Sequence, residues 1–307
     1  MDLSIIIVNW NTRELLAGCL GSVLRCQTSP TADGRPLAAE VIVVDNASTD
    51  GSAALARQRF PQVRLIENAR NVGFAAANNQ ALRLGRGRYV VLLNSDTEVH
   101  LGALEVLVGF METHPRAGGC GPRLLNADGS LQASCHPMLT PGREFWRLLF
   151  LDRLWRRATY AQAAWDWQTP RPVEVIKGAC LLLRRAALEQ VGPLDESYFM
   201  YTEEMDLCYR LAQAGWELWW VPQAVVKHYE GASSKQVAEA MYLQLYRSKV
   251  QFYRKFGGAR RAERFKRLLG LAYAPRLAVA ALGVPFSPSL AARAHTYHRL
   301  LAELGSM

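Results

Sequence analysis

The sequence predicts an α/β protein with a mainly parallel sheet flanked by helices. Short runs rich in β-branched residues, each too short for a helix, stand at Leu3–Val8, Glu40–Val44 and 88–94. Between these runs, apolar residues recur at helical spacing. Such alternation is typical of a parallel sheet covered on both faces, in which ligands bind beyond the carboxyl ends of the strands.

The expected elements follow in order along the chain. Leu3–Val8, with three consecutive isoleucines, is the first strand, and Asn11 or Thr12 caps the helix after it, because either side chain can accept a hydrogen bond from the first turn. Pro, Gly and Asp at 28–38 indicate a loop. Further helices are expected near 13–26, 51–59, 74–85, 101–113 and 203–214, and further strands near 40–44, 63–67, 88–94, 118–123, 173–183 and 217–221.

The stretch 134–172 carries prolines and four tryptophans and is expected to be irregular. It fits a mobile loop or a lid, although tryptophans in such a stretch more often pack into the core. From residue 236 onward the pattern is helical, with interruptions near Gly257-Gly258 and at three prolines. The chain therefore divides into an α/β domain, 1–235, and a helical C-terminal extension, 236–307.

The positive charge of the chain lies in this extension. Residues 247–307 hold 12 Lys and Arg and 2 Glu, a balance of +10, whereas residues 1–246 hold 24 Lys and Arg against 25 Asp and Glu, a balance of −1. Leu277–Phe286 is apolar but too short to span a bilayer. Beside the basic helix expected at 254–267, it fits either peripheral contact with a membrane surface or a helix pair packed on the body. No nucleic-acid partner is expected.

Six cysteines show no CxxC pair and no short regular spacing. With no signal peptide in view, they are interpreted as reduced thiols of a cytoplasmic protein, and zinc bound by cysteine is not expected. The chain, at 307 residues, can bury a full α/β core.

Three polar residues, Asn9, Asp45 and Asp96, stand where apolar strands end, which places them at the ligand-binding edge of the predicted sheet. Asp45 can accept hydrogen bonds from a ring N–H of a nucleobase. An Asx turn that caps the next helix explains the same residue equally well. Asp50 is the better candidate for that cap.

The segment from Asn71 to Asn79 is a candidate phosphate site. Gly73 lets the backbone approach a ligand, and a helix that begins there favours an anion at its N-terminus. Ordinary turn-to-helix chemistry, with Asn78 facing solvent, is the more frequent explanation of such a segment.

Asn94, Ser95 and Asp96 follow a buried strand, and a carboxylate there can bind a divalent ion and neutralise a diphosphate. His228 ends another apolar run and is either a ligand of the same ion or a buried structural imidazole.

Glu203, Glu204 and Asp206 crowd the first turn of a predicted helix. The helix dipole favours acids there, but three exceed what capping requires. Their mutual repulsion raises the proton affinity of at least one, which suits a general base.

Together these segments resemble the inverting glycosyltransferases of family 2, which have a GT-A fold, and within them the rhamnosyltransferase-like branch that builds bacterial surface polysaccharides. The resemblance covers roughly residues 1–235 in unbroken order, and the ordered set of motifs is more specific than any one of them. The motifs are Asp45-Asn46-Ala47-Ser48-Thr49-Asp50-Gly51, Asn71-Val72-Gly73-Phe74, Leu93-Asn94-Ser95-Asp96, Lys177-Gly178-Ala179, Glu203-Glu204-Met205-Asp206-Leu207-Cys208 and His228.

The resemblance implies a role for each matched position. Asp96 and His228 would hold Mg²⁺ or Mn²⁺, and Glu204 would be the base that deprotonates the acceptor hydroxyl, with Glu203 and Asp206 as rivals. The nucleotide-sugar donor would be bound by Asn9, Asp45, Asn71, Gly73, Asn78, Asn94 and Ser95. The acceptor side would be formed by Gly178 and Ala179.

Two positions depart from the family's pattern. Asn94 stands where the first Asp of a DxD triplet is common, which leaves fewer charges on the metal. Glu204 stands where the family commonly has Asp.

The resemblance also implies partners and a location. The donor would be a nucleotide-diphospho-sugar, with dTDP-rhamnose favoured and UDP-sugars next, and the acceptor a saccharide or a lipid-linked saccharide. The protein would be cytoplasmic, with the basic extension as a peripheral contact to the inner membrane. A catalytically inactive nucleotide-sugar-binding protein and a sugar-phosphate nucleotidyltransferase remain as alternatives. The absence of GxGxxG after Leu3–Val8 argues against a Rossmann oxidoreductase.

Overall fold

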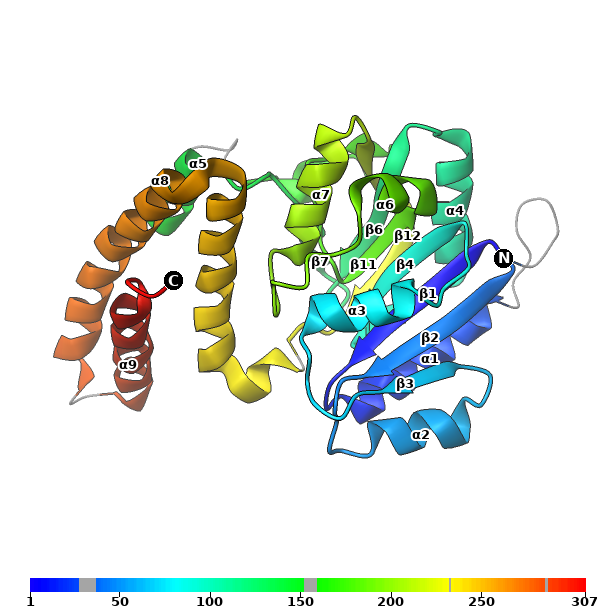
Figure 1. The fold of residues 1–307 in the computed structure, drawn as a ribbon, viewed down its shortest axis with the longest axis horizontal. Helices are drawn as coiled ribbons and strands as arrows, with labels where there is room; N and C mark the ends of the chain where they lie inside the picture. Colours follow the sequence, from blue (N-terminus) through cyan, green and yellow to red (C-terminus); the bar gives the residue numbers. More distant parts are fainter. Residues whose placement is uncertain (28–36, 152–158, 232, 285–286) are drawn as a thin grey trace. The chain divides into compact units, whose positions relative to one another are not determined.

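The computed structural model describes residues 1–27, 37–151, 159–231, 233–284 and 287–307 (Figure 1). The expected loop at 28–38 lies outside the described residues except for its last two positions. By its internal contacts the chain forms two compact units. The first, the α/β unit, consists of residues 1–138, 161–199 and 203–236, and the second, the helical unit, of residues 139–160, 200–202 and 237–307.

The α/β unit is built on a ten-stranded sheet whose main path runs in the order β3-β2-β1-β4-β11-β6-β12-β5. Its strands are β1 (Leu3–Asn9), β2 (Ala39–Asp45), β3 (Arg64–Glu67), β4 (Tyr89–Asn94), β5 (Thr97–Val99), β6 (Ala117–Leu125), β7 (Leu131–Gln132), β9 (Arg171–Pro172), β11 (Cys180–Arg184) and β12 (Glu217–His228). A separate antiparallel pair consists of β8 (Cys135–His136) and β10 (Val175–Ile176).

The sheet is mixed and mainly parallel along its path, as the sequence predicts. Strands β1, β2, β3 and β4 are parallel neighbours, and β6 is parallel to β12. Strand β11 is antiparallel to both β4 and β6, and β5 is antiparallel to β12. The register pairs Asn9 with Asp45 and Val8 with Asn94, so the carboxyl ends of β1, β2 and β4 meet at one edge.

Helices cover both faces of this sheet (Figure 1). On β1, Ile5 and Ile7 join the core under α1, α2 and α4, whereas Ile6 and Val8 join the core under α3, α6 and α7. The alternation follows from the two-residue period of a strand, and it explains why the strands read as unbroken apolar runs. The helices are α1 (Arg13–Gln27), α2 (Ser52–Arg59), α3 (Phe74–Leu82), α4 (Ala103–Thr113), α6 (Arg185–Val191) and α7 (Glu203–Gln213).

Most expected elements agree with the structure to within a few residues. The expectation of an irregular stretch at 134–172 is wrong in part, because helix α5 (Pro141–Leu148) lies within it, capped by Thr140, whose hydroxyl oxygen accepts a hydrogen bond from the N–H of Arg143. Helix α6 was not expected, and the strand expected near 217–221 and the apolar run that ends at His228 form one strand, β12.

The helical unit contains α5, α8 (Ala238–Leu282) and α9 (Pro288–Glu303) around an apolar core with Val250, Phe265 and Leu300 at its centre. The expected interruption near Gly257-Gly258 is confirmed, since Gly258 has φ 70° and ψ 176° and kinks α8. Pro275, by contrast, lies within the helix without ending it.

One buried ion cluster belongs to this unit. Lys249 Nζ lies 3.0 Å from Glu144 Oε2, and Arg147 donates to both oxygens of the same carboxylate. Burial alone would raise the pKa of Glu144, but Lys249 and Arg147 hold it down at about 2. A charged pair at this depth holds α5 to α8 because the removal of either partner leaves the other buried and uncompensated.

All six cysteines are free and buried. Burial raises the pKa of Cys26 to about 11 and that of Cys19 to about 12. Across the part of the chain that the structure describes, the helices are all too short or too polar to cross a membrane.

Candidate functional site

A chain of hydrogen bonds joins the carboxyl ends of β1, β2 and β4. The hydroxyl of Thr12 lies 2.6 Å from Asn9 Oδ1 and 2.9 Å from Ser95 Oγ. The amide of Asn9 donates to Asp45 Oδ1 over 3.0 Å and to Ser48 Oγ over 3.1 Å. Five residues at or just beyond three strand ends are thus fixed relative to one another, and Asn9, Asp45 and Ser95 among them were predicted from the sequence.

Asp45 is held by the loop that follows it. Its Oδ2 accepts the N–H of Ser48 over 3.0 Å, which is the Asx-type contact that the sequence allowed, and only 3% of the residue is exposed. Asp50 accepts the N–H groups of Ser52 and Arg13, the first residues of α2 and α1. The role of Asp45 at a nucleobase stays a prediction.

Asn46 is a residue that the sequence did not single out, and it organises the neighbouring loop. Its amide donates to Asn71 Oδ1 over 2.8 Å, and its Oδ1 accepts the N–H of Val72 over 3.0 Å. Asn71 Oδ1 also accepts the N–H of Gly73. The Asn-Val-Gly segment is therefore fixed by β2, and Asn71 serves this loop internally.

Gly73 is required by packing against the chain itself. Its φ is +88°, and a Cβ there would lie 2.5 Å from the carbonyl oxygen of Phe199. The N–H of Phe74 donates to that same oxygen over 2.7 Å. The approach of the Phe199 backbone thus gives this glycine a structural reason, and its place in donor binding stays a prediction.

The side chain of Asn78 bonds to the backbone of the helix that carries it. It is 1% exposed, and its amide donates to the carbonyl oxygen of Phe74 one turn earlier. This rules out the alternative of a solvated side chain, because the buried amide satisfies its donor on the helix backbone, and the role of Asn78 in donor binding stays a prediction.

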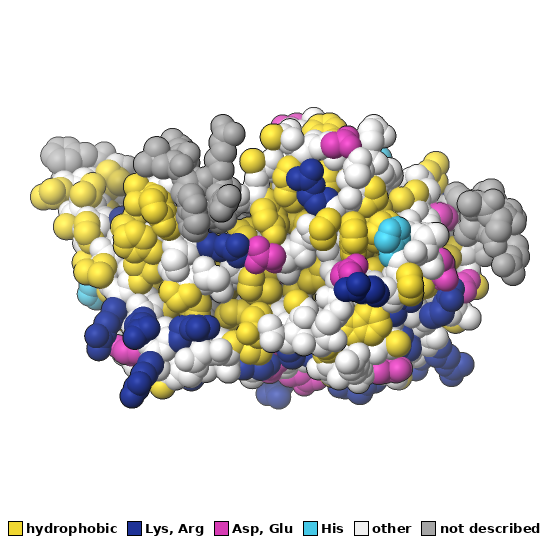
Figure 2. All heavy atoms as spheres, turned by 90° about the horizontal axis from the view of Figure 1, so that it is seen from above, with side chains coloured by type: hydrophobic (Ala, Val, Ile, Leu, Met, Phe, Trp, Pro, Cys, Tyr) yellow, Lys and Arg dark blue, Asp and Glu magenta, His cyan; other side chains and the backbone are white. Residues whose placement is uncertain are grey.

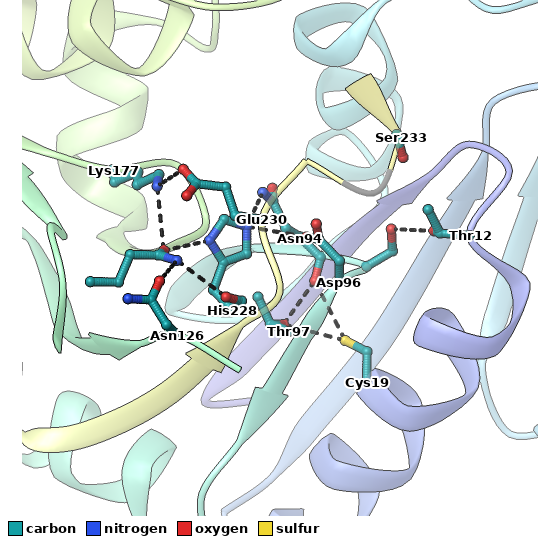
Figure 3. Close-up of polar contacts among 12 residues, drawn as sticks. Thr12, Cys19, Asn94, Asp96, Thr97, Asn126, Lys177, His228, Glu230 and Ser233 are labelled. Atoms are coloured by element: carbon teal, nitrogen blue, oxygen red, sulfur yellow. Dashed lines mark hydrogen bonds and ion pairs between the residues drawn. The ribbon is translucent and has the colours of Figure 1, made fainter. Parts of the chain in front are cut away.

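Asp96 and His228 lie side by side, although 132 residues separate them in sequence. His228 Nε2 is 3.2 Å from Asp96 Oδ1 and 3.3 Å from Asn94 Nδ2. The antiparallel pairing of β5 with β12 sets His228 opposite Thr97, and the N–H of Tyr229 donates to the carbonyl oxygen of Asp96. Figure 3 shows the side chains of Asn94, Asp96 and His228 gathered at this point.

The other ring nitrogen of His228 meets Gln132, which fixes the tautomer of the imidazole. His228 Nδ1 lies 2.7 Å from Gln132 Oε1, and the ammonium of Lys177 lies 3.3 Å from the same oxygen. An ammonium can only donate, so the atom that faces it must be the carbonyl oxygen of the glutamine, and Nδ1 must therefore carry the proton. In the neutral form of the ring, the lone pair would then lie on Nε2.

A carboxylate oxygen 3.2 Å from Nε2 fits either an imidazolium paired with Asp96 or a cation held between the two side chains. The pair of Asp96 and His228 is complementary to a divalent ion, since both are ordinary metal ligands and the second ring nitrogen of a ligating histidine commonly donates to an oxygen. Within the described ranges, no cluster of three or more His, Cys, Asp and Glu side chains could hold a metal. Mg²⁺ and Mn²⁺ suit a site with few protein ligands, because substrate phosphates and water complete their coordination.

Lys177 and Glu230 extend the network behind the ring (Figure 3). Lys177 Nζ lies 2.6 Å from Glu230 Oε1, and the ammonium lowers the pKa of this carboxyl. Gln132 and Glu230 were missed in the sequence because nothing in their local pattern marks them. Lys177 could have been found, since it begins the Lys-Gly-Ala motif.

The three acids of α7 have different surroundings. Asp206 is fully buried and is paired with Arg210, whose Nε lies 2.6 Å from Oδ1. Glu203 is buried with Oε2 lacking a hydrogen bond, and burial, reinforced by the charge of Glu204, raises its pKa well above the usual value. Glu204 is half-buried. Asp206 therefore serves as a structural partner of Arg210, whereas Glu203 is the acid whose charged form burial disfavours.

Gly178 and Ala179 link the acids of α7 to the end of β4, where the proposed metal ligands lie. A Cβ on Gly178 would lie 3.6 Å from Cβ of Glu204, and the carbonyl oxygen of Ala179 accepts the N–H of Asn94 over 3.0 Å. The short segment before β11 thus touches Glu204 at one residue and the end of β4 at the next. The candidate base and the candidate metal site therefore adjoin the same short segment.

Several backbone conformations around the site are strained. Asn11, Ala47 and Glu230, which follow β1, β2 and β12, all have positive φ angles between 51° and 65°. Tyr201 and Thr202, immediately before α7, have φ angles of 67° and 72°. Non-glycine residues in this region cost free energy, and such residues cluster at functional sites.

The comparisons with known proteins agree with this geometry. The model of glycosyl transferase family 2 matches residues 4–192. This range includes Asp45, Asp96 and Gly178, whereas α7 and His228 lie beyond it.

Two curated relatives and two solved structures are similar to this chain. An N-acetylglucosaminyl-diphospho-decaprenol L-rhamnosyltransferase of Mycobacterium tuberculosis is 36% identical over 217 residues, which is 66% of this chain and 70% of the relative. The low-salt glycan biosynthesis hexosyltransferase Agl10 of Haloferax volcanii is 27% identical, over 68% of this chain and 61% of the relative.

The solved structures share the fold. A mannosyltransferase of Pyrobaculum calidifontis, in complex with GDP-Man and Mn²⁺, superimposes with a TM-score of 0.56 at 19% identity, over 98% of this chain and 85% of that one. GalNAc-T7 with UDP, GalNAc and Mn²⁺ has a TM-score of 0.55 at 17% identity, over 82% of this chain and 50% of that one. These likenesses identify the GT-A architecture.

Proposed function

From the premise that this chain belongs to glycosyl transferase family 2 and is a glycosyltransferase, we propose that it performs a metal-dependent, inverting transfer at the edge formed by β1, β2, β4 and β12. The observation that supports this proposal is the approach of His228 Nε2 to the Asp96 carboxylate at 3.2 Å, because both side chains are ordinary ligands of divalent ions.

Asp96 and His228 would hold Mg²⁺ or Mn²⁺. When bound, the ion would neutralise negative charge on the diphosphate of the nucleotide-sugar donor, commonly a large part of such catalysis. Asn94 adds no charge but directs its amide to His228 Nε2. Asn9, Asp45 and Ser95 line the same edge through their hydrogen-bond chain, and Asp45 is proposed to orient the base of the nucleotide.

Glu204 is proposed as the general base. Asp206 is paired with Arg210, and burial disfavours the charged form of Glu203, so both are less suited than Glu204 to receive the proton. Glu204 is half-buried and adjoins Gly178, on the proposed acceptor side. It would take the proton of the acceptor hydroxyl as that oxygen attacks the anomeric carbon from the face opposite the nucleotide, and a single displacement of this kind inverts the configuration.

The sugar and acceptor are proposed from the relative of 36% identity, which is named for transfer of L-rhamnose to N-acetylglucosaminyl-diphospho-decaprenol. We propose dTDP-rhamnose as the donor and a lipid-linked saccharide as the acceptor, in the synthesis of a bacterial surface polysaccharide. A peripheral contact with the cytoplasmic face of the inner membrane would bring the enzyme to such an acceptor.

The test is a transfer assay with dTDP-rhamnose and, in parallel, UDP- and GDP-sugars, with N-acetylglucosaminyl-diphospho-polyprenol as acceptor. The wild-type enzyme is expected to need Mn²⁺ or Mg²⁺, and Asp96→Ala is expected to lose transfer. Asp128→Asn, in an exposed turn of the same unit, is the matched control and should retain full activity. Transfer that survives in Asp96→Ala would refute the proposed metal role, and donor binding without transfer in the wild-type protein would favour the inactive binding protein instead.

A further inference from the structure

The helical unit exposes large apolar side chains on α5 and α8. Leu271, Val279 and Leu282 of α8 are 74%, 69% and 79% exposed, and Phe150, just after α5, is 71% exposed. Single exposed apolar residues are ordinary on a protein surface, but a contiguous set marks an interaction surface.

One stripe of α8 carries these residues at helical spacing. Beyond the kink at Gly258, the exposed positions Leu271, Pro275, Ala278 and Leu282 follow one another at intervals of four, three and four residues. Residues at these intervals share one face of a helix. The α8 stripe is therefore apolar along three successive turns.

The same stripe is basic in the preceding turns. Arg260, Arg264 and Arg267 are exposed and continue the spacing of four, three and four residues up to Leu271. Residues 259–282 hold six Lys and Arg and one Glu, a balance of +5. In the left-hand part of Figure 2, which holds the α8 and α9 region of Figure 1, hydrophobic side chains and Lys and Arg side chains gather in neighbouring places.

Phe150 joins this surface in a strained conformation. Its φ is +58°, which a bulky residue rarely adopts. The guanidinium of Arg276 lies 4.6 Å from the centre of its ring and also donates to the carbonyl oxygen of Leu148, so the end of α5 is held against α8. Val279 stands one turn beyond Arg276, between this contact and the α8 stripe. At Phe150 the helical unit thus combines a strained backbone with an exposed aromatic ring.

We propose that Phe150 and the α8 stripe form a docking surface for an anionic membrane. The arginines would contact phosphate headgroups, and Leu271, Leu282 and Phe150 would enter the boundary between headgroups and acyl chains, as in helices that lie in a membrane interface. A second copy of this chain is the less suitable occupant, because a two-fold contact through the same stripe would set its arginines against either the arginines or the apolar side chains of the other copy. The inference rests on the peripheral membrane contact of the proposed function and names its surface, and it concerns the helical unit alone, so its test does not depend on the proposed metal site.

The experiment is flotation of the full-length protein with vesicles, without donor or acceptor. Vesicles in which about a third of the lipid is phosphatidylglycerol are compared with phosphatidylcholine vesicles, at low and high salt. The wild-type protein is expected to bind the anionic vesicles about tenfold more tightly and to lose this preference at high salt. Leu271→Asp with Leu282→Asp should weaken binding by about tenfold or more, and Arg260→Glu with Arg264→Glu should remove the preference for anionic lipid.

Leu101→Asp is the matched control, since Leu101 is 69% exposed but belongs to the α/β unit. Thermal stabilisation by nucleotide diphosphates checks that each variant is folded, and Leu282→Ser, at the exposed last turn of α8, provides a milder substitution. The proposal is overturned if the wild-type protein does not float, if Leu101→Asp weakens binding as much as the paired substitutions, or if Leu271→Asp instead dissociates a dimer. Failure of vesicle binding with donor-dependent stabilisation retained would leave the proposed transfer untouched.

Discussion

His228 Nδ1 lies 2.7 Å from Gln132 Oε1, an oxygen that also faces the ammonium of Lys177. The amide nitrogen of Gln132 donates in turn to Asn126 Oδ1 and to the carbonyl oxygen of His228, so the orientation of the glutamine is fixed on both sides. This residue, which touches neither the proposed metal nor a substrate, therefore determines which nitrogen of His228 presents a lone pair to Asp96.

Replacement of Gln132 should weaken metal binding. Gln132→Leu removes the acceptor for Nδ1, so the proton is free to move to Nε2 and the ring loses its orientation. We expect the affinity for Mn²⁺ to fall by about 10- to 100-fold, as for other groups that orient a ligating histidine. Electron paramagnetic resonance of free Mn²⁺ during a titration measures this directly, without turnover.

Gln190→Leu is the control for that substitution, because Gln190 bonds Trp216 at the end of α6, outside the network of His228. An unchanged Mn²⁺ affinity in a folded Gln132→Leu protein would contradict the positioning role of Gln132.

Two acids of α7 should have different roles, with Glu204 acting in the reaction and Asp206 stabilising the fold. Glu204→Gln should lower kcat by about 10²- to 10⁴-fold with little change in melting temperature, since it removes the proposed base from a half-buried position. Asp206→Asn should instead destabilise the fold by about 3 kcal/mol, because Arg210 loses the buried carboxylate that neutralises it. Steady-state kinetics and thermal unfolding on both variants would show the split, and a Glu204→Gln enzyme with normal kcat would remove Glu204 from its role.

Glu203 should make stability depend on pH. Because burial raises the pKa of Glu203 in the folded state, the unfolded chain releases this proton first as the pH rises above the usual value, and the folded state becomes progressively less stable until the pH exceeds the raised pKa. Glu203→Gln should therefore match the wild type near pH 4 and melt at least about 2 °C higher near pH 8. Melting curves across this range test the sign, and an equal difference at both pH values would show that the carboxyl is not protonated in the fold.

Gly73 should tolerate no side chain. Gly73→Ala combines a positive φ with a Cβ placed 2.5 Å from the carbonyl oxygen of Phe199, and we expect a loss of about 3 kcal/mol or more in unfolding free energy. Gly129→Ala has a φ of +84° but no atom within 4 Å of its Cβ, so it measures the backbone strain alone and should cost about 1 kcal/mol. Similar losses in denaturant unfolding of the two variants would mean that the Phe199 contact is not the constraint.

The strand ends of the α/β unit could be predicted because local pattern determines them. Leu3–Val8 is buried on both faces, so its apolar run is visible without knowledge of its neighbours. Helix α5 could not be predicted in the same way. Glu144, in its first turn, is buried with Lys249 and Arg147, whereas the neighbouring Phe145 is exposed, so the apolar residues of this helix do not mark its buried face.

The residue types of the site could be predicted, whereas several of their contacts could not. Asp96 and His228 were identified by their positions after apolar runs, yet their proximity depends on the antiparallel pairing of β5 with β12, which is a long-range contact. Gly73 was identified as a special position, but the atom that approaches it belongs to Phe199, 126 residues away in the sequence. Local sequence indicates that a glycine is needed without indicating what lies against it.

The six cysteines all belong to the α/β unit, and the helical unit has none. Burial keeps these thiols protonated, with the pKa of Cys19, Cys135, Cys180 and Cys208 near 12, so alkylating reagents can react only after the surrounding structure opens. In the native protein, thiol modification therefore detects local opening of the α/β unit only. Its rate would measure how often the structure around the cysteines opens, whereas opening of the helical unit, which has no cysteine, would give no signal.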